Sequence, residues 1–112
     1  MHIRKLLVAL LLTVSLSATA DFISVEDGYE ISLKNLTTPV TNTGSLIFKE
    51  CDECDTLMFR MTTNTRFIIG GRTVDLKEFR KQVFQVSNPD KVPVTVLRNL
   101  ESNTIVSVSV GL

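Results

Sequence analysis

The two cysteines of the chain, Cys51 and Cys54, stand in a C-x-x-C spacing and are the residues best suited to chemistry. Such a pair can act as a thiol–disulfide redox centre, contribute to a metal site or form a structural disulfide. A redox centre needs a thiol whose pKa is lowered by a helix N-terminus or a nearby cation. The adjacent charged residues are instead all acidic: Glu50, Asp52, Glu53 and Asp55. Carboxylates disfavour the thiolate, so we expect a structural disulfide and keep a periplasmic thiol–disulfide protein as the second alternative.

Metal binding is the first alternative for this motif. The candidate ligands for zinc or copper are the two cysteines and the neighbouring carboxylates: Cys51, Cys54, Asp52, Glu53 and Asp55. A structural zinc site takes four ligands, usually sulfur or nitrogen, and one copy of the chain offers only two thiols. A homodimer that shares four cysteines would complete such a site. Covalent haem attachment is excluded, because Asp55 occupies the position of the required histidine.

A β-hairpin over Ser45 to Thr62 must position the two cysteines. With Asp52 and Glu53 as the turn residues, the alternation of side chains along each strand places four large apolar residues on one face: Leu46, Phe48, Leu57 and Phe59. The same register sets Cys51 opposite Cys54, close enough to be bridged after a small adjustment.

The first twenty residues read as a signal peptide. Arg4 and Lys5 form a basic start, an apolar run follows over 6–16, and Ala18-Thr19-Ala20 supplies a small-residue cleavage site. We expect cleavage after Ala20, which leaves residues 21–112 as a single β-rich domain without a stable membrane anchor. The short basic leader indicates a bacterial periplasmic or secreted protein, a compartment in which disulfides persist.

The exported chain lacks the residues of several catalytic and binding classes. Without Arg4 and Lys5, ten basic residues face twelve acidic ones, a formal charge near −2. That charge argues against nucleic acid as a partner. The only histidine, His2, leaves with the leader, so no Ser-His-Asp triad can form. We expect a non-enzymatic protein without a cofactor, whose partner is an envelope protein or a glycan.

A basic region lies in the second half of the chain and is opposite in sign to the cysteine motif. Its members are Arg66, Arg72, Lys77, Arg80 and Lys81. This region could contact anionic glycans, lipid head groups or an acidic protein, although many such runs are simply solvated helix faces.

The remaining elements are predicted from turn residues and periodicity. Residues 22–33 read as a first hairpin around a loop at 26–28, and residues 34–44 as a polar connector that Leu36 and Val40 attach to the core. Gly70-Gly71 predicts a tight turn that sets Phe67 opposite Val74.

One amphipathic helix is expected over about residues 76–86, capped by Asp75. A last hairpin joins residues 92–98 to 104–110, with Val94 opposite Val108 and with Ser107 facing outward. Pro93 suggests that its first strand is an edge strand, or pairs on one side only there. The predicted fold is a small, mostly antiparallel β-barrel or sandwich built from hairpins, with one helix near 76–86.

The stretch from Thr65 to Leu76, together with residues 94–96 and 105–108, resembles small exported bacterial domains of unknown function. Those domains look like OB-type barrels with a T-x-F-x-I-x-G-x-x-V-x-L stretch, a helical turn and a closing hairpin. The resemblance implies a barrel and implies no catalytic residues.

Overall fold

The computed structural model describes residues 25–112, and the expected signal peptide lies outside the described residues. The elements run in the order β1 (Glu26–Ser32), η2 (Leu33–Asn35), β2 (Leu36–Thr37), β3 (Ser45–Lys49), β4 (Thr56–Ile69), β5 (Arg72–Val74), α2 (Leu76–Phe84), η3 (Pro89–Lys91), β6 (Pro93–Asn99) and β7 (Thr104–Val110). No helix in this part of the chain combines the length and the apolar character needed to cross a membrane.

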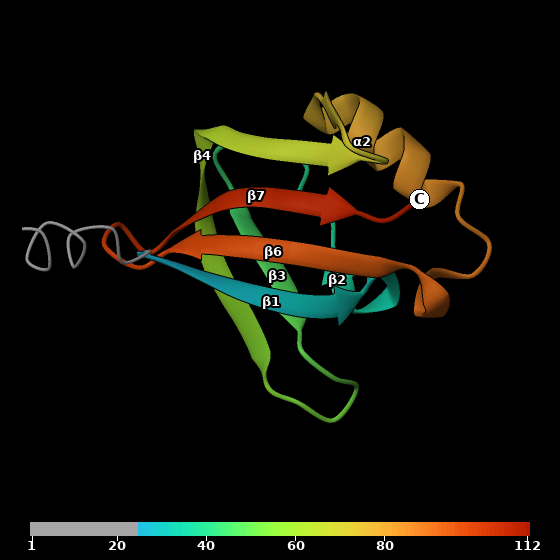
Figure 1. Ribbon diagram of the computed structural model, residues 1–112, viewed down its shortest axis with the longest axis horizontal. Helices are drawn as coiled ribbons and strands as arrows, with labels where there is room; N and C mark the ends of the chain where they lie inside the picture. The colour runs from blue at the N-terminus through green and yellow to red at the C-terminus, as the bar shows by residue number, and fades with distance from the viewer. Residues whose placement is uncertain (1–24) are drawn as a thin grey trace, which may run out of the picture.

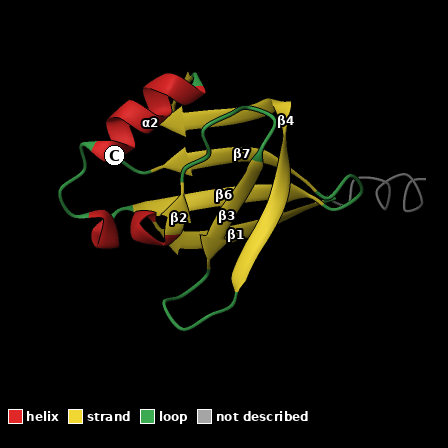
Figure 2. Cartoon of the chain, turned by 180° about the vertical axis from the view of Figure 1, so that it is seen from behind, coloured by secondary structure: helices red, strands yellow, loops and turns green. Residues whose placement is uncertain are grey.

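The strands form one curled sheet, which confirms the predicted mostly-β fold with a single α-helix in the described residues (Figure 1). The strand order is β1-β6-β7-β4-β3-β2, and β5 pairs with β4 outside this path. Seen from behind, the sheet bends into a half-barrel, with α2 across one end (Figure 2). Because each strand is apolar on one face only, the curl of the sheet lets these faces pack against each other.

The hairpin of β3 and β4 has the predicted register. Leu46 pairs with Phe59, and Phe48 pairs with Leu57. The paired strands end at Lys49 and Thr56, so the connecting loop is longer than two residues, but Asp52 and Glu53 are its central turn residues. The amide of Cys54 donates to the carbonyl of Cys51 at 3.2 Å, which closes this turn.

Strand β4 runs without a break through residues 63–65. It bends sharply there and keeps its strand character, as Figure 1 shows. The buried hydroxyl of Thr65 donates to the carbonyl of Ile105 at 2.7 Å and accepts from the amide of Thr62 at 3.0 Å. This side chain therefore supplies hydrogen bonds at the bend, where the register between β4 and β7 is interrupted.

The Gly70-Gly71 turn and the helix are confirmed. Both glycines have positive φ angles, 57° and 81°, and Phe67 pairs with Val74 as predicted. The Asp75 side chain caps α2 by accepting from the amide of Glu78 at 2.7 Å. The helix ends at Phe84, two residues before the predicted end.

The first predicted hairpin is wrong. Strand β1 runs straight through Asp27 and Gly28 and pairs along its whole length with β6. Gly28 lies opposite Leu97, and a Cβ at this glycine would lie 3.5 Å from the Leu97 side chain. The glycine therefore lies within a paired strand and not in a turn, and a Cβ there would make only an ordinary van der Waals contact. In the following connector Leu36 is buried as expected, but Val40 is 72% exposed.

The last hairpin exists, but its register differs from the predicted one by one residue next to the loop and by two residues farther along the strands. Val94 pairs with Val110 and not with Val108. An irregularity near Val106 allows both Ile105 and Val108 to point into the core, although they are an odd number of residues apart. Ser107, expected to face outward, is buried. Strand β6 lies between β1 and β7 and is not an edge strand. Pro93 is aligned with Ser32 of β1, and its carbonyl also accepts from the amide of Gly111, just after β7, at 3.0 Å.

The core fills the inside of the curled sheet beneath α2. Its largest fully buried side chains are Phe48, Phe79, Leu46, Met61, Ile105, Val94, Val96, Val108 and Val110. Phe79 joins the helix to the sheet, because its ring centroid lies 5.0 Å from that of Phe67.

Candidate functional site: a bridged acidic tip and a cationic groove

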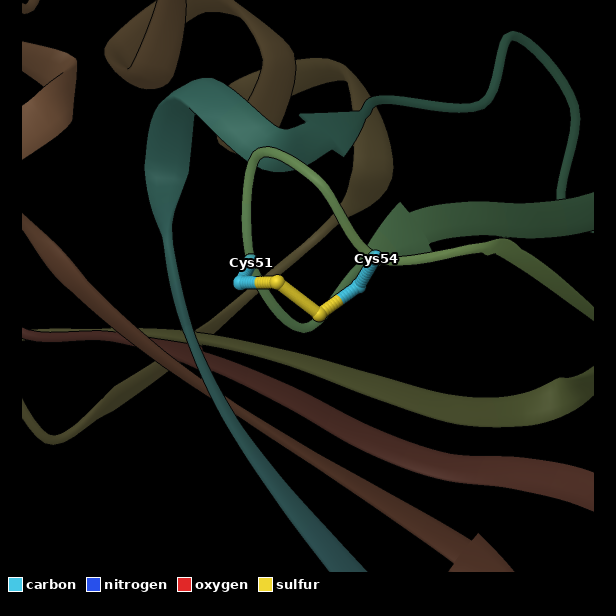
Figure 3. Close-up of a disulfide and its surroundings, with 2 residues drawn as sticks. All are labelled: Cys51 and Cys54. Carbon is cyan, nitrogen blue, oxygen red and sulfur yellow. A yellow bond between two sulfur atoms is a disulfide. The ribbon is translucent and has the colours of Figure 1, made fainter.

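The cysteines form a disulfide at the end of the β3–β4 hairpin, as expected. Cys51 and Cys54 are joined with a Cα–Cα distance of 5.0 Å, and Figure 3 shows the bridge closing the small loop between them. We call residues 50–55 the acidic tip. Its four carboxylates, those of Glu50, Asp52, Glu53 and Asp55, are exposed.

The acidic tip is tied to the rest of the domain by one ion pair. The Lys34 ammonium in η2 donates to the Asp52 carboxylate at 3.0 Å. The hydrogen bond from Lys34, together with one from Asn35, lowers the pKa of Asp52 below the usual aspartate value. The cysteine loop therefore has a defined position against η2.

In the bridged state neither sulfur is a thiolate, so neither can act as a nucleophile or as a thiolate ligand. Among the described residues, no three His, Cys, Asp or Glu side chains gather as a possible metal site. The zinc or copper site therefore stays a prediction for a reduced form of the protein.

A groove lies between α2 and the segment that follows β1. Its volume is about 700 Å³. Its apolar lining comes from Leu33, Leu36, Val83, Phe84 and Pro89, and its cationic lining from Lys34, Lys77, Arg80 and Lys81. No carboxylate is among the lining residues. The groove therefore combines apolar surface with a positive rim, a combination suited to an anionic partner.

Three of the five predicted cations meet at this groove, and the spacing of the helix brings them together. Lys77, Arg80 and Lys81 are one helical turn apart or adjacent, so they share the exposed face of α2. The ion pairs in the described part of the chain are Lys34–Asp52 and Arg98–Asp27, so these three cations form none.

The other two predicted cations lie elsewhere. Arg66 is exposed on β4, where it pairs with Ser107, and Arg72 begins β5 opposite Ile69. Neither lines the groove. The predicted basic region is therefore divided between the helix and the strands.

Sequence reasoning missed Phe84 and Lys34. Phe84 follows Lys77 by seven residues and Lys81 by three, so helical periodicity alone could have placed it on the cationic face. It is 92% exposed, an unusual environment for a phenylalanine. No local sequence pattern predicts that Lys34 lines the groove, because the fold brings it there from a distant part of the chain.

Comparisons of the chain with protein-family models, curated proteins and solved structures found no match, so its function is inferred from its own geometry.

Proposed function

We propose that this chain is an exported, non-enzymatic binding module of the bacterial envelope that recognises an anionic partner at the groove beside α2. The leader-like N-terminus and the bridged cysteines support export. The absence of histidine after residue 2 supports a binding role over acid–base catalysis.

The observation that carries the proposal is the composition of the groove. Lys77, Arg80 and Lys81 are exposed along one helix face, and no carboxylate lines the groove beside them. In a chain whose exported part is slightly acidic, such a separation of charge creates a local positive field. The field attracts an anionic partner, and the apolar walls add contact area.

The acidic tip has a structural role in this proposal. The disulfide and the Lys34–Asp52 pair hold the loop against η2, which forms one wall of the groove. The tip thereby helps to fix the position of that wall.

Salt elution from immobilised heparin and immobilised polyglutamate tests the binding proposal. We expect the protein to be retained at low salt and the Lys77→Gln/Arg80→Gln variant to elute at clearly lower salt. The matched control is Arg66→Gln/Arg72→Gln, which removes the same charge outside the groove and should elute close to the unmodified protein. Equal losses in both variants, or no retention at all, would show that the groove is not a specific anion site.

Intact mass of protein taken from the periplasm tests the export and disulfide parts. We expect a chain that begins at Asp21, is two hydrogens light and does not react with a thiol-alkylating reagent. Two alkylatable thiols with a bound metal ion would favour the metal-binding alternative. Two alkylatable thiols with reversible oxidation and turnover of a thiol substrate would favour the thiol–disulfide alternative.

A further inference from the structure

We propose that the partner of the α2 face is an anionic phospholipid surface and that Phe84 inserts into it. This inference rests on the proposed function, because it names the partner of the same groove. It depends on three features of the described residues: the row of cations and Phe84 on the outer face of α2, the exposed apolar side chains beside this row, and the position of the acidic tip.

The row on α2 places an aromatic residue among cations. Lys77, Arg80, Lys81 and Phe84 recur at intervals of three and four residues, so they face the same way. The opposite side of the helix is used by the core, where Leu76 and Phe79 are buried. The outer face of α2 therefore offers cations for lipid phosphates and one exposed aromatic ring for the acyl region, while the apolar face of the helix stays in the core.

Exposed apolar side chains stand on both sides of the cations. Phe84, 92% exposed, borders the first groove. Val40, 72% exposed, borders a second groove of about 540 Å³ that also includes Lys77, Arg80 and the carboxylate of Asp75, which caps α2. The two cations shared by both grooves can reach lipid phosphates while the apolar residues enter the acyl region. An acidic peptide would use the charges but would not require apolar residues on both flanks.

The position of the acidic tip is compatible with binding of anionic lipid at the outer face of α2. In Figures 1 and 2 the loop between β3 and β4 lies at the edge of the molecule opposite α2. The Asp52 carboxylate does reach Lys34 in the groove wall, where the ion pair offsets its charge. A surface that meets the outer face of α2 meets the helix cations first, and salt screens its repulsion from the carboxylates of the tip.

Vesicle sedimentation with protein purified after export, its N-terminus established by mass, tests the inference. We expect binding to vesicles that contain phosphatidylglycerol and none to pure phosphatidylcholine, with release at high salt. Lys77→Gln/Arg80→Gln should weaken binding about 25-fold, since each basic residue near the surface contributes about fivefold. Arg66→Gln/Arg72→Gln removes the same charge and should change binding by less than about threefold.

Phe84 provides a second, independent readout. Phe84→Ser should weaken vesicle binding about tenfold, whereas the matched loss of another exposed apolar residue, Leu100→Ser, should leave it unchanged. The chain contains no tryptophan, so Phe84→Trp introduces a single indole fluorophore. Its emission should shift to shorter wavelength on phosphatidylglycerol vesicles and become protected from acrylamide quenching.

Three outcomes would overturn the membrane assignment: no vesicle binding at low salt, equal losses in the two charge variants, or an indole emission of the Phe84→Trp variant that bound vesicles leave unchanged. Release from vesicles by equimolar inorganic phosphate or glycerophosphoglycerol would also overturn it, since a free anion would then account for the site. Retention on polyglutamate without vesicle binding would leave the proposed anion-binding function standing and identify an acidic protein as the partner class.

Discussion

The ammonium of Lys34 and the carboxylate of Asp52 lie 3.0 Å apart and connect η2 to the acidic tip, although the residues are 18 positions apart in sequence. Their side chains are 43% and 62% exposed. An ion pair this open to water contributes little to global stability, because solvent screens the charges. Its effect is local: it fixes where the cysteine loop rests relative to the wall of the groove.

Because of this ion pair, the pKa of Asp52 reports whether the acidic tip is in contact with Lys34. We expect an NMR titration midpoint for Asp52 below the usual aspartate range, and a midpoint that moves upward in Lys34→Gln, because the hydrogen bond from Lys34 lowers the pKa. The folded-state pKa is depressed, so the contribution of the pair is present above the unfolded-state pKa and is lost as the pH falls through the folded-state value. Lys77→Gln is the control, and an equal shift in that variant would contradict a local origin.

Removal of the disulfide should leave the fold intact. The bridge closes a loop of only about four residues, for which the chain-entropy account gives about 2 kcal/mol. We expect Cys51→Ser/Cys54→Ser to unfold cooperatively in urea with a loss of that size or less. Amide chemical shifts should change mainly in the acidic tip and in η2. Collapse of shift dispersion throughout β6 and β7 would show that the bridge holds the whole domain.

Local patterns predicted the elements whose side chains alternate without interruption. The β3–β4 register followed from four large apolar residues that a slip of one position would expose, and Leu46 and Phe48 are indeed buried. The Gly70-Gly71 turn and the cap at Asp75 carry their own chemical signals. The disulfide was predictable because the same register sets Cys51 opposite Cys54 at the turn.

Patterns failed where tertiary pairing overrode local preference. Asp27-Gly28 is a good turn sequence, yet both residues pair with β6 and belong to strand β1. Strict alternation predicted the wrong partner for Val94, because the irregularity near Val106 changes which side chains of β7 face inward. The parallel pairing of β4 with β7, and the arrival of Lys34 at the groove, depend on contacts between distant segments that no short window of sequence contains.

Thr65 should be the most sensitive polar residue at the bend of β4. Thr65→Val keeps the side-chain shape but removes the hydroxyl that bonds the Ile105 carbonyl and the Thr62 amide. The Ile105 carbonyl loses its partner at a buried position and the Thr62 amide at a partly buried one, so we expect a loss of about 1–3 kcal/mol in the free energy of unfolding. Thr63→Val, at an exposed position in the same bend, is the matched control and should change stability by less than about 0.5 kcal/mol. Similar losses in the two variants would contradict this role for the Thr65 hydroxyl.

The two phenylalanines of α2 separate the structural face of the helix from its outer face. Phe79 is fully buried and its ring centroid lies 5.0 Å from that of Phe67, so Phe79→Ala should cost about 3–5 kcal/mol in urea unfolding. Phe84 is 92% exposed, so Phe84→Ala should change stability by less than about 0.5 kcal/mol. A large loss for Phe84→Ala would mean that its ring packs within the domain in solution. If Phe84→Ala leaves the free energy of unfolding unchanged, as expected, the exposed ring does not stabilise the domain. The ring is then available for contact with an external surface.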